Sequence, residues 1–158
     1  MNNSPQIDFL SNLKRFTKIT VLSLCKCNIE ISDFFTFLSK DSLNENRIQY
    51  LYLSGNKCEK QISNEIKIPK FEEIRLDHIK WNDNFLLFFQ LLIKTQKFID
   101  LSNSTMNENE WNKVFNYLNT TSDGTSQLCK MLWNGNQVNK SFFSYLRKCK
   151  NSIDSLQI

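Results

Sequence analysis

The stretch Ile48-Gln49-Tyr50-Leu51-Tyr52-Leu53-Ser54-Gly55-Asn56 decides the fold of this 158-residue chain. In it, one apolar residue is followed by a second three positions later and by a third two positions after that, and Asn56 comes three positions further on. The same spacing recurs in five other triplets, one of which has a polar first member: Ile19-Leu22-Leu24, Phe71-Ile74-Leu76, Gln96-Ile99-Leu101, Leu128-Met131-Trp133 and Ile153-Leu156-Ile158. Because side chains alternate across a strand, the second and third members of each triplet are expected to share its buried face.

This spacing is the strand signature of a leucine-rich repeat. The middle anchors of successive triplets are about 23 to 32 residues apart, and intervals near 28 leave room for a helix after the strand. Three positions after the last anchor, such repeats usually carry a polar side chain that bonds the backbone. The residues at this position are Cys27, Asn56, Ile79, Ser104 and Asn136. We therefore predict an α/β fold, a right-handed leucine-rich-repeat solenoid in a horseshoe arc, with a parallel concave sheet and convex helices.

Helical spacing and capping residues predict where the convex helices lie. The predicted ranges are 32–38, 82–95, 107–119 and 139–150. Glu108 and Glu110 fall in the first turn of the third helix, where negative charge complements the helix dipole. Between Asn56 and Phe71 the short interval and Pro69 predict a turn or one loose helical turn.

The repeats predict how the chain is divided. Residues 1–18 contain one amphipathic stretch and are expected to form an N-terminal helix or half-repeat cap. Residues 19–158 hold five full repeats plus a final strand. A bare final strand exposes unpaired backbone, so we expect additional repeats or another chain to cap it.

The composition bears on where the protein is located in the cell. The N-terminus lacks a basic segment followed by an apolar run, and no apolar stretch approaches the roughly 20 residues of a membrane span. Five cysteines without a disulfide-rich spacing predict reduced thiols and a cytoplasmic location. Cys27 and Cys58 fall on positions predicted to point inward. Cys25-x-Cys27 is interpreted as structural rather than as a metal or redox pair, because Cys27 is the ladder residue, Cys25 lies just past the strand, and no second Cys pair or His cluster follows. No cofactor or metal is expected.

Catalysis and nucleic-acid binding are both disfavoured. His78 is the only histidine, and although it stands beside Asp77, the sequence supplies neither a nucleophile nor a shaped pocket for it. The net charge is +4, and charges predicted on the concave face are mixed in sign, whereas nucleic-acid binding needs a coherent basic stripe. The chain is therefore predicted not to be an enzyme.

A partner-binding surface is predicted on the concave face, where residues flanking each middle anchor point outward. Aromatic and charged side chains of the kinds that dominate binding hot spots gather there. The predicted partner-binding residues are Tyr50, Tyr52, Glu73, Arg75, Phe98, Asp100, Lys130 and Leu132. Strand propensity alone also favours Tyr and Phe, which is the alternative interpretation. A second candidate surface is the apolar helix around Leu87 and Leu91, whose leucines exceed what packing onto the sheet requires.

The strings Leu51-Tyr52-Leu53-Ser54-Gly55-Asn56 and Leu101-Ser102-Asn103-Ser104 resemble the strand-and-exit segments of ribonuclease-inhibitor-type leucine-rich repeats. Within that class, the irregular repeat lengths are similar to those of CARMIL-type actin-regulatory scaffolds. This resemblance implies an intracellular protein-interaction scaffold, with a place in actin regulation. GTPase-activating proteins for Ran share the repeat class, which leaves a GTPase-activating regulator as one alternative. A surface or secreted recognition protein is the other.

Overall fold

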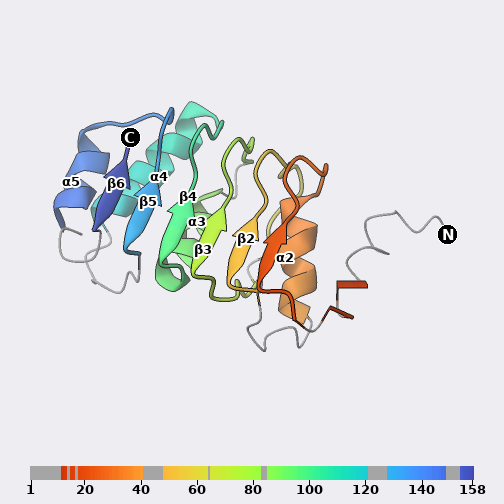
Figure 1. Ribbon diagram of the computed structural model, residues 1–158. Helices are drawn as coiled ribbons and strands as arrows, with labels where there is room; N and C mark the ends of the chain where they lie inside the picture. The colour runs from red at the N-terminus through yellow and green to blue at the C-terminus, as the bar shows by residue number, and fades with distance from the viewer. Residues whose placement is uncertain are drawn as a thin grey trace.

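The computed structural model describes residues 12–13, 15–16, 18–40, 48–63, 65–82, 85–120, 128–148 and 154–158. Over these residues the chain forms one six-stranded parallel sheet, with neighbouring strands in sequence order (Figure 1). The strands are β1 (Val21–Ser23), β2 (Tyr50–Tyr52), β3 (Glu73–Arg75), β4 (Phe98–Asp100), β5 (Lys130–Leu132) and β6 (Ser155–Gln157). The helices are α2 (Ile31–Lys40), α3 (Phe85–Thr95), α4 (Glu108–Thr120) and α5 (Lys140–Lys148). The predicted α/β class with a parallel sheet is confirmed.

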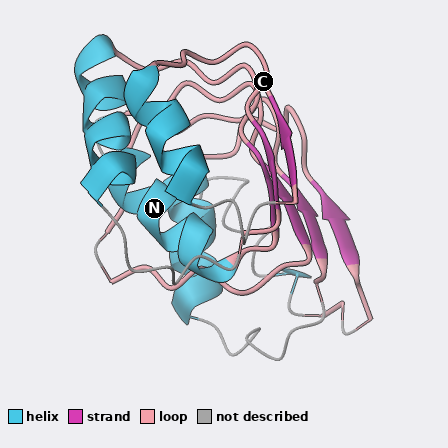
Figure 2. Ribbon diagram, turned by 90° about the vertical axis from the view of Figure 1, so that its left-hand side faces the viewer, coloured by secondary structure: helices cyan, strands magenta, loops and turns pink. Residues whose placement is uncertain are grey.

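The sheet and the helices form two layers (Figure 2). A helix follows β1, β3, β4 and β5, and the helix predicted over residues 82–95 begins at Phe85. Residues 56–63 and 65–71, between β2 and β3, contain no helix, which confirms the turn predicted there. The helices therefore cover one face of the sheet and leave the other, here called the outer face, without a described helix over it (Figure 2).

The middle anchors of the six triplets lie side by side across the sheet. The parallel pairing joins them in the order Leu22, Leu51, Ile74, Ile99, Met131 and Leu156. The four on the inner strands are fully buried against the helix layer. Because a slip of one residue would turn every side chain to the opposite face, this common register fixes which residues reach the outer face.

Aromatic rings fill the space between the two layers. Phe88 packs against Phe35, with ring centroids 5.1 Å apart, and against Trp81, at 5.3 Å. Nearer the C-terminal end, Trp133 stacks on Phe142 at 5.2 Å. Burial of each such ring contributes about 1.5–3 kcal/mol. The contact between Phe35 and Phe88 joins two different strand-helix units, whereas the other two contacts pack a helix against the turn that precedes it.

Helix α3 carries the most apolar segment of the described chain. Phe85, Phe89 and Leu92, the residues predicted to pack onto the sheet, are fully buried. Leu87 and Leu91 are half-buried, and Leu91 packs against the core. Neither leucine belongs to the exposed large apolar residues of the described part. The α3 surface is thus less open than an unpartnered docking face would be.

Asparagine side chains cap the starts of α4 and α5. Asn107 Oδ1 accepts a hydrogen bond from the backbone N–H of Glu110 at 2.9 Å, and Asn139 Oδ1 accepts one from Phe142 at 3.1 Å. Such a cap satisfies an amide that the helix leaves unpaired and contributes about 1 kcal/mol. Glu110 lies in the first turn of α4 as predicted, but it is buried and its carboxylate pairs with Lys113.

The turn after each of the first five strands contains one left-handed residue at the same place, four positions after the middle anchor. These residues are Lys26 (φ 54°), Gly55 (φ 68°), His78 (φ 56°), Asn103 (φ 53°) and Gly135 (φ 69°). Gly55 N donates to Asp77 O at 2.9 Å, and His78 N donates to Ser102 O at 2.9 Å. The hydrogen-bond ladder of the sheet therefore continues into the turns. The stacking is close, since a Cβ at Gly55 would lie 2.9 Å from Lys26 Cγ.

Asparagine side chains connect neighbouring turns, as the sequence predicted. Asn56 Oδ1 accepts from Cys27 N at 3.1 Å and Ile29 N at 3.0 Å. Asn56 Nδ2 donates to Leu24 O at 2.8 Å and Leu53 O at 2.7 Å. The buried Asn56 amide thus satisfies four backbone groups that would otherwise lack a partner. Asn136 acts likewise between the turns after β4 and β5, accepting from Ser104 N at 2.7 Å.

The first turn departs from the sequence-based expectation. Cys58 is buried as predicted, but Cys27, also predicted to point inward, is exposed. The reason is its place, because in the described part of the chain no strand precedes β1 and covers it. The predicted helix or cap over residues 1–18 lies mostly outside the described residues. Of its apolar side chains, Leu13 is buried and Phe16 is exposed.

Candidate functional site

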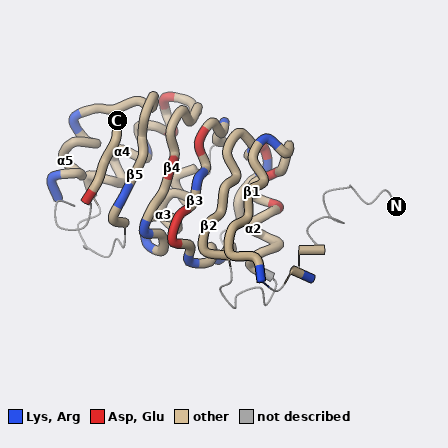
Figure 3. Tube along the Cα trace, in the orientation of Figure 1, with Lys and Arg blue, Asp and Glu red and all other residues tan. Residues whose placement is uncertain are grey.

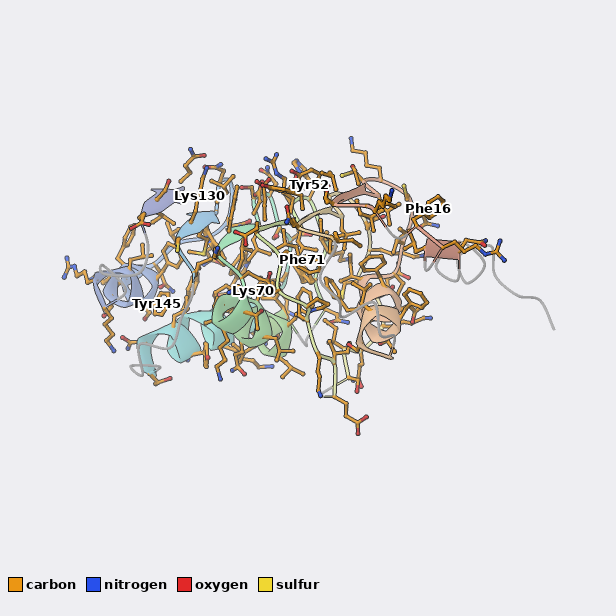
Figure 4. The ribbon with its side chains drawn as sticks, turned by 60° about the horizontal axis from the view of Figure 1, so that its bottom comes forward. Phe16, Tyr52, Lys70, Phe71, Lys130 and Tyr145 are labelled. Carbon is orange, nitrogen blue, oxygen red and sulfur yellow. The ribbon has the colours of Figure 1, made fainter. Side chains whose placement is uncertain are left out.

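The predicted partner-binding residues lie on β2 to β5, at the positions flanking each middle anchor. Tyr50, Glu73 and Phe98 form a row before the anchors, which continues into Lys130. Tyr52 and Arg75 belong to the row after the anchors. Figure 4 shows Tyr52 and Lys130 on the side of the sheet away from the helices. The structure therefore brings side chains from four strands together on the outer face.

Tyr52, Glu73 and Arg75 form one connected group. Arg75 Nε donates to Glu73 Oε1 at 2.6 Å, and the Arg75 guanidinium lies 5.1 Å from the centre of the Tyr52 ring. Burial, followed by the negative charge of Glu73, raises the pKa of the Tyr52 hydroxyl. The hydrogen bond to Glu73 in turn raises the pKa of Arg75. The Arg75 guanidinium is thus held over the Tyr52 ring, at a distance that favours cation–π attraction.

Phe98 and Lys130 form a second pair on the next two strands. The Lys130 ammonium lies 4.6 Å from the centre of the Phe98 ring, and both side chains are half-buried. Tyr50, at 36% exposure, is the most open ring of the set. Leu132, beside the buried anchor Met131, is also half-buried. The outer face therefore carries two cations, each positioned over an aromatic ring of the neighbouring strand.

Asp100 differs from the sequence-based prediction, because only 7% of it is exposed. Its Oδ1 accepts a hydrogen bond from Ser102 N at 3.0 Å, which ties the side chain to the turn after β4. The carboxylate also adds to the field that raises the pKa of Arg75. Asp100 therefore supports the turn and the charge on Arg75 more than it offers a contact surface.

Charges of both signs are interspersed on the outer face, as Figure 3 shows along β3 to β5. Glu73 and Arg75 neutralise each other in an ion pair, and Asp100 and Lys130 add one charge of each sign. Within the described strands no continuous basic stripe forms. The arrangement suits a partner whose own charges are mixed better than it suits a uniformly anionic polymer.

A polar group of Ser54, Asp77 and His78 lies at the end of the outer face, in the turns after β2 and β3, and the sequence analysis noted only its Asp77-His78 pair. Asp77 accepts hydrogen bonds from Ser54 Oγ at one oxygen and pairs with His78 Nδ1 at the other, at 2.7 Å. Burial alone would raise the pKa of Asp77, but the bonds from Ser54 and His78 outweigh it and lower that pKa. Ser54 could have been found from the repeat spacing, since it and Asp77 each come three positions after a middle anchor.

This group does not have the geometry of a hydrolytic centre. The Ser54 hydroxyl donates to the carboxylate, whereas activation of a serine requires its proton to face an imidazole nitrogen. His78 is exposed and lies on the far side of Asp77. The bonds among these three residues hold the turns together and give no sign of an activated nucleophile.

The described residues contain neither a metal-binding cluster nor a membrane-spanning helix. In the described ranges no group of three or more His, Cys, Asp or Glu side chains is arranged to hold a metal ion. None of the helices of the described part has both the length and the apolar character needed to cross a bilayer.

Comparison of the chain with protein-family models, with curated proteins and with solved structures found no match.

Proposed function

We propose that this chain is a leucine-rich-repeat solenoid that binds a protein partner through the outer face of its sheet and catalyses no reaction. Three features support the solenoid: the sequential strand order, the left-handed residue after each of the first five strands, and the asparagines that link neighbouring turns. In this proposal residues 19–158 hold five repeats and a final strand, the crossovers are right-handed, and the outer face is concave.

One observation carries the binding proposal: the charged and aromatic side chains of the outer face already hold one another in place. Arg75 is fixed between Glu73 and the Tyr52 ring, and Lys130 is fixed over Phe98. Side chains that are ordered before a partner arrives lose less conformational entropy on binding. A face made of such residues is therefore well suited to recognise one surface with high affinity.

The residues of this face have different proposed roles. Tyr50, Tyr52 and Phe98 are the anchors, because large rings dominate the energy of protein interfaces. Arg75 and Lys130 set the orientation of the partner through its carboxylates, since charged pairs contribute more to register than to affinity. Glu73 holds Arg75 in place.

The proposed location is the cytoplasm. Four cysteines of the described part, Cys25, Cys27, Cys58 and Cys129, are free thiols, which accords with a reducing compartment. A scaffold in actin regulation remains the prediction made from the resemblance to CARMIL-type proteins.

The experiment starts by finding the partner. A photo-crosslinking phenylalanine analogue at position 50 captures the protein that contacts the outer face in cells, and the same analogue at Phe143 is the matched control. Phe143 is a suitable control because it is an exposed aromatic residue on α5, in the helix layer, with 45% exposure. We expect capture of one protein at position 50 and not at position 143.

The captured protein is then produced and its affinity is measured by calorimetry. The double variant Tyr52→Ala/Phe98→Ala should lose about 2 kcal/mol or more of binding free energy, because hot-spot rings lose that much on truncation. Its fold should persist, since each side chain is next to a buried middle anchor in its strand and therefore on the opposite face of the sheet. Phe143→Ala should bind like the wild type. Unchanged binding of the double variant, with weakened binding of Phe143→Ala, would transfer the interface to the helix layer.

A further inference from the structure

The turn after β1 carries two exposed thiols one residue apart, Cys25 and Cys27. Among the described cysteines these two alone are exposed, because Cys58 is buried and Cys129 is half-buried. Cys27 was predicted to point inward, and its side chain is exposed instead.

The two thiols stand on either side of the left-handed residue Lys26. Lys26 and Asn28 are both left-handed, with φ of 54° and 56°, so the chain reverses on each side of Cys27. Cys27 Sγ donates to the carbonyl oxygen of Cys25 at 3.3 Å. Cys25 Sγ lies 3.6 Å from Ser23 Oγ. Both thiols therefore lie in one short exposed turn, where rotation about χ1 can reorient each sulfur atom.

The first turn is also built differently from the others. It has two left-handed residues, whereas the next four turns have one each. Glu30, eight positions after its middle anchor, pairs with Lys57, which comes only six positions after its own. The first turn is thus two residues longer than the second between the middle anchor and the bridge that pairs the two turns. Stacking of the turns does not require this extra length, because Lys57, Lys80 and Thr105 align without it.

The hydrogen bonds of the two sulfur atoms stay within residues 23–27, so neither thiol joins this turn to the next repeat. Cys27 bonds the neighbouring turn through its backbone N–H, which donates to Asn56 Oδ1, and not through its sulfur. Cys58 is the contrasting case: burial raises the pKa of its thiol to about 12, so it remains protonated and unreactive.

We propose that Cys25 and Cys27 form a two-thiolate binding site for monovalent copper. Thiolates are soft ligands and select soft cations such as Cu(I), which is satisfied by two of them in a linear arrangement. Zinc fits poorly, because it takes four ligands and no cluster of three or more ligating side chains occurs in the described residues. The two cysteines are one residue apart, and the described residues add no third ligating side chain to them, which favours a two-coordinate ion.

Two thiols each lose their proton, two Cu–S bonds form, and no electron is transferred, so one Cu(I) ion is exchanged for two protons. Affinity should therefore rise with pH, as metal binding to thiols does. The bis-thiolate complex carries one negative charge. Lys26, between the two cysteines, supplies a positive charge on the same turn, with its stem lying over Gly55.

The test titrates the purified protein with Cu(I) under anaerobic reducing conditions, with bicinchoninate as the competing chelator. The variant Cys129→Ser/Cys149→Ser removes the half-buried thiol and the one outside the described residues, so that Cys25, Cys27 and the buried Cys58 remain. We expect one equivalent of Cu(I) per chain in this background. Adding Cys25→Ser or Cys27→Ser should weaken binding by about 100-fold or more, because the second ligand no longer acts at high effective concentration.

Two controls keep the outcome decisive. Cys58→Ser in the same background should leave the affinity unchanged, provided that circular dichroism shows an intact fold. Alkylation followed by trypsin, which cuts after Lys26, places Cys25 and Cys27 on separate peptides, and bound Cu(I) should protect both. A loss below about 10-fold in each serine variant, or protection of only one thiol, would overturn the two-thiolate site.

Discussion

The inner strands β2 to β5 and the end strands β1 and β6 carry the same apolar spacing but are buried to different extents. Leu51 and Ile74, middle anchors of inner strands, are fully buried. Leu22 on β1 retains 7% exposure, and Leu156 on β6 is only half-buried. The cause is that an inner strand has a paired neighbour on each side, whereas an end strand has one. Burial in this sheet is therefore decided by neighbours more than by the residue itself.

The same difference separates the functional features. The outer-face residues belong to inner strands, where neighbouring side chains position one another, as Arg75 does with Tyr52 and Lys130 with Phe98. The two thiols belong to the turn after β1, where no described strand covers them. Inner strands thus favour a preorganised surface, and end strands leave groups accessible for reaction or ligation.

The largest expected effect tests the comparison of anchors directly. Ile74→Ala should lower the free energy of unfolding by about 2–5 kcal/mol, because a fully buried side chain is lost and a cavity remains. Leu156→Ala should cost about 1 kcal/mol, since part of that side chain is already in contact with water. Urea denaturation followed by circular dichroism measures both values. Equal losses would show that neighbours do not control the energetics of this sheet.

A smaller effect is expected where an asparagine links an end strand to an inner one. Asn56→Ala removes four hydrogen bonds to the turns after β1 and β2 and should cost about 1–3 kcal/mol. Asn136→Ala should cost less, because that residue is half-buried. Its side chain accepts a hydrogen bond from Ser104 N and donates one to Leu101 O, which is two bonds instead of four. Urea denaturation compares the two variants, and hydrogen exchange at Ile29 should accelerate in Asn56→Ala alone. Unchanged exchange at Ile29 would contradict the proposed link between β1 and β2.

The sequence was a good guide to features that repeat and a poor one to features that depend on neighbours. The strand positions and the buried anchors followed from local spacing, because alternation and apolar burial are properties of the segment itself. The burial of Asp100 did not follow, because it depends on a bond from Ser102 in the turn. The exposure of Cys27 did not follow either, since the same position is buried at Asn56, where a preceding strand covers it.

The smallest expected effect concerns acid and the turn after β3. The pKa of Asp77 in the folded protein is lower than its ordinary value, since the bonds from Ser54 and His78 outweigh the effect of burial. The unfolded chain therefore binds the proton at a higher pH than the folded chain does. It follows that Asp77 stabilises the fold above about pH 4, and that this contribution disappears as the pH falls through the lowered folded-state pKa.

Asp77→Asn tests this contribution, because the amide cannot titrate. The difference in unfolding free energy between the wild type and Asp77→Asn should be about 1 kcal/mol or less near pH 6 and should shrink toward pH 3. Ser54→Ala should reduce the same pH-dependent difference, since it removes one of the two bonds that lower the pKa of Asp77.

The turn after β1 differs, because Cys25 stands at the position that Asp77 has in the turn after β3, so the first turn lacks a carboxylate there. Hydrogen exchange should accordingly show acid loosening the turn after β3 before the turn after β1, and the reverse order would contradict the role given to Asp77.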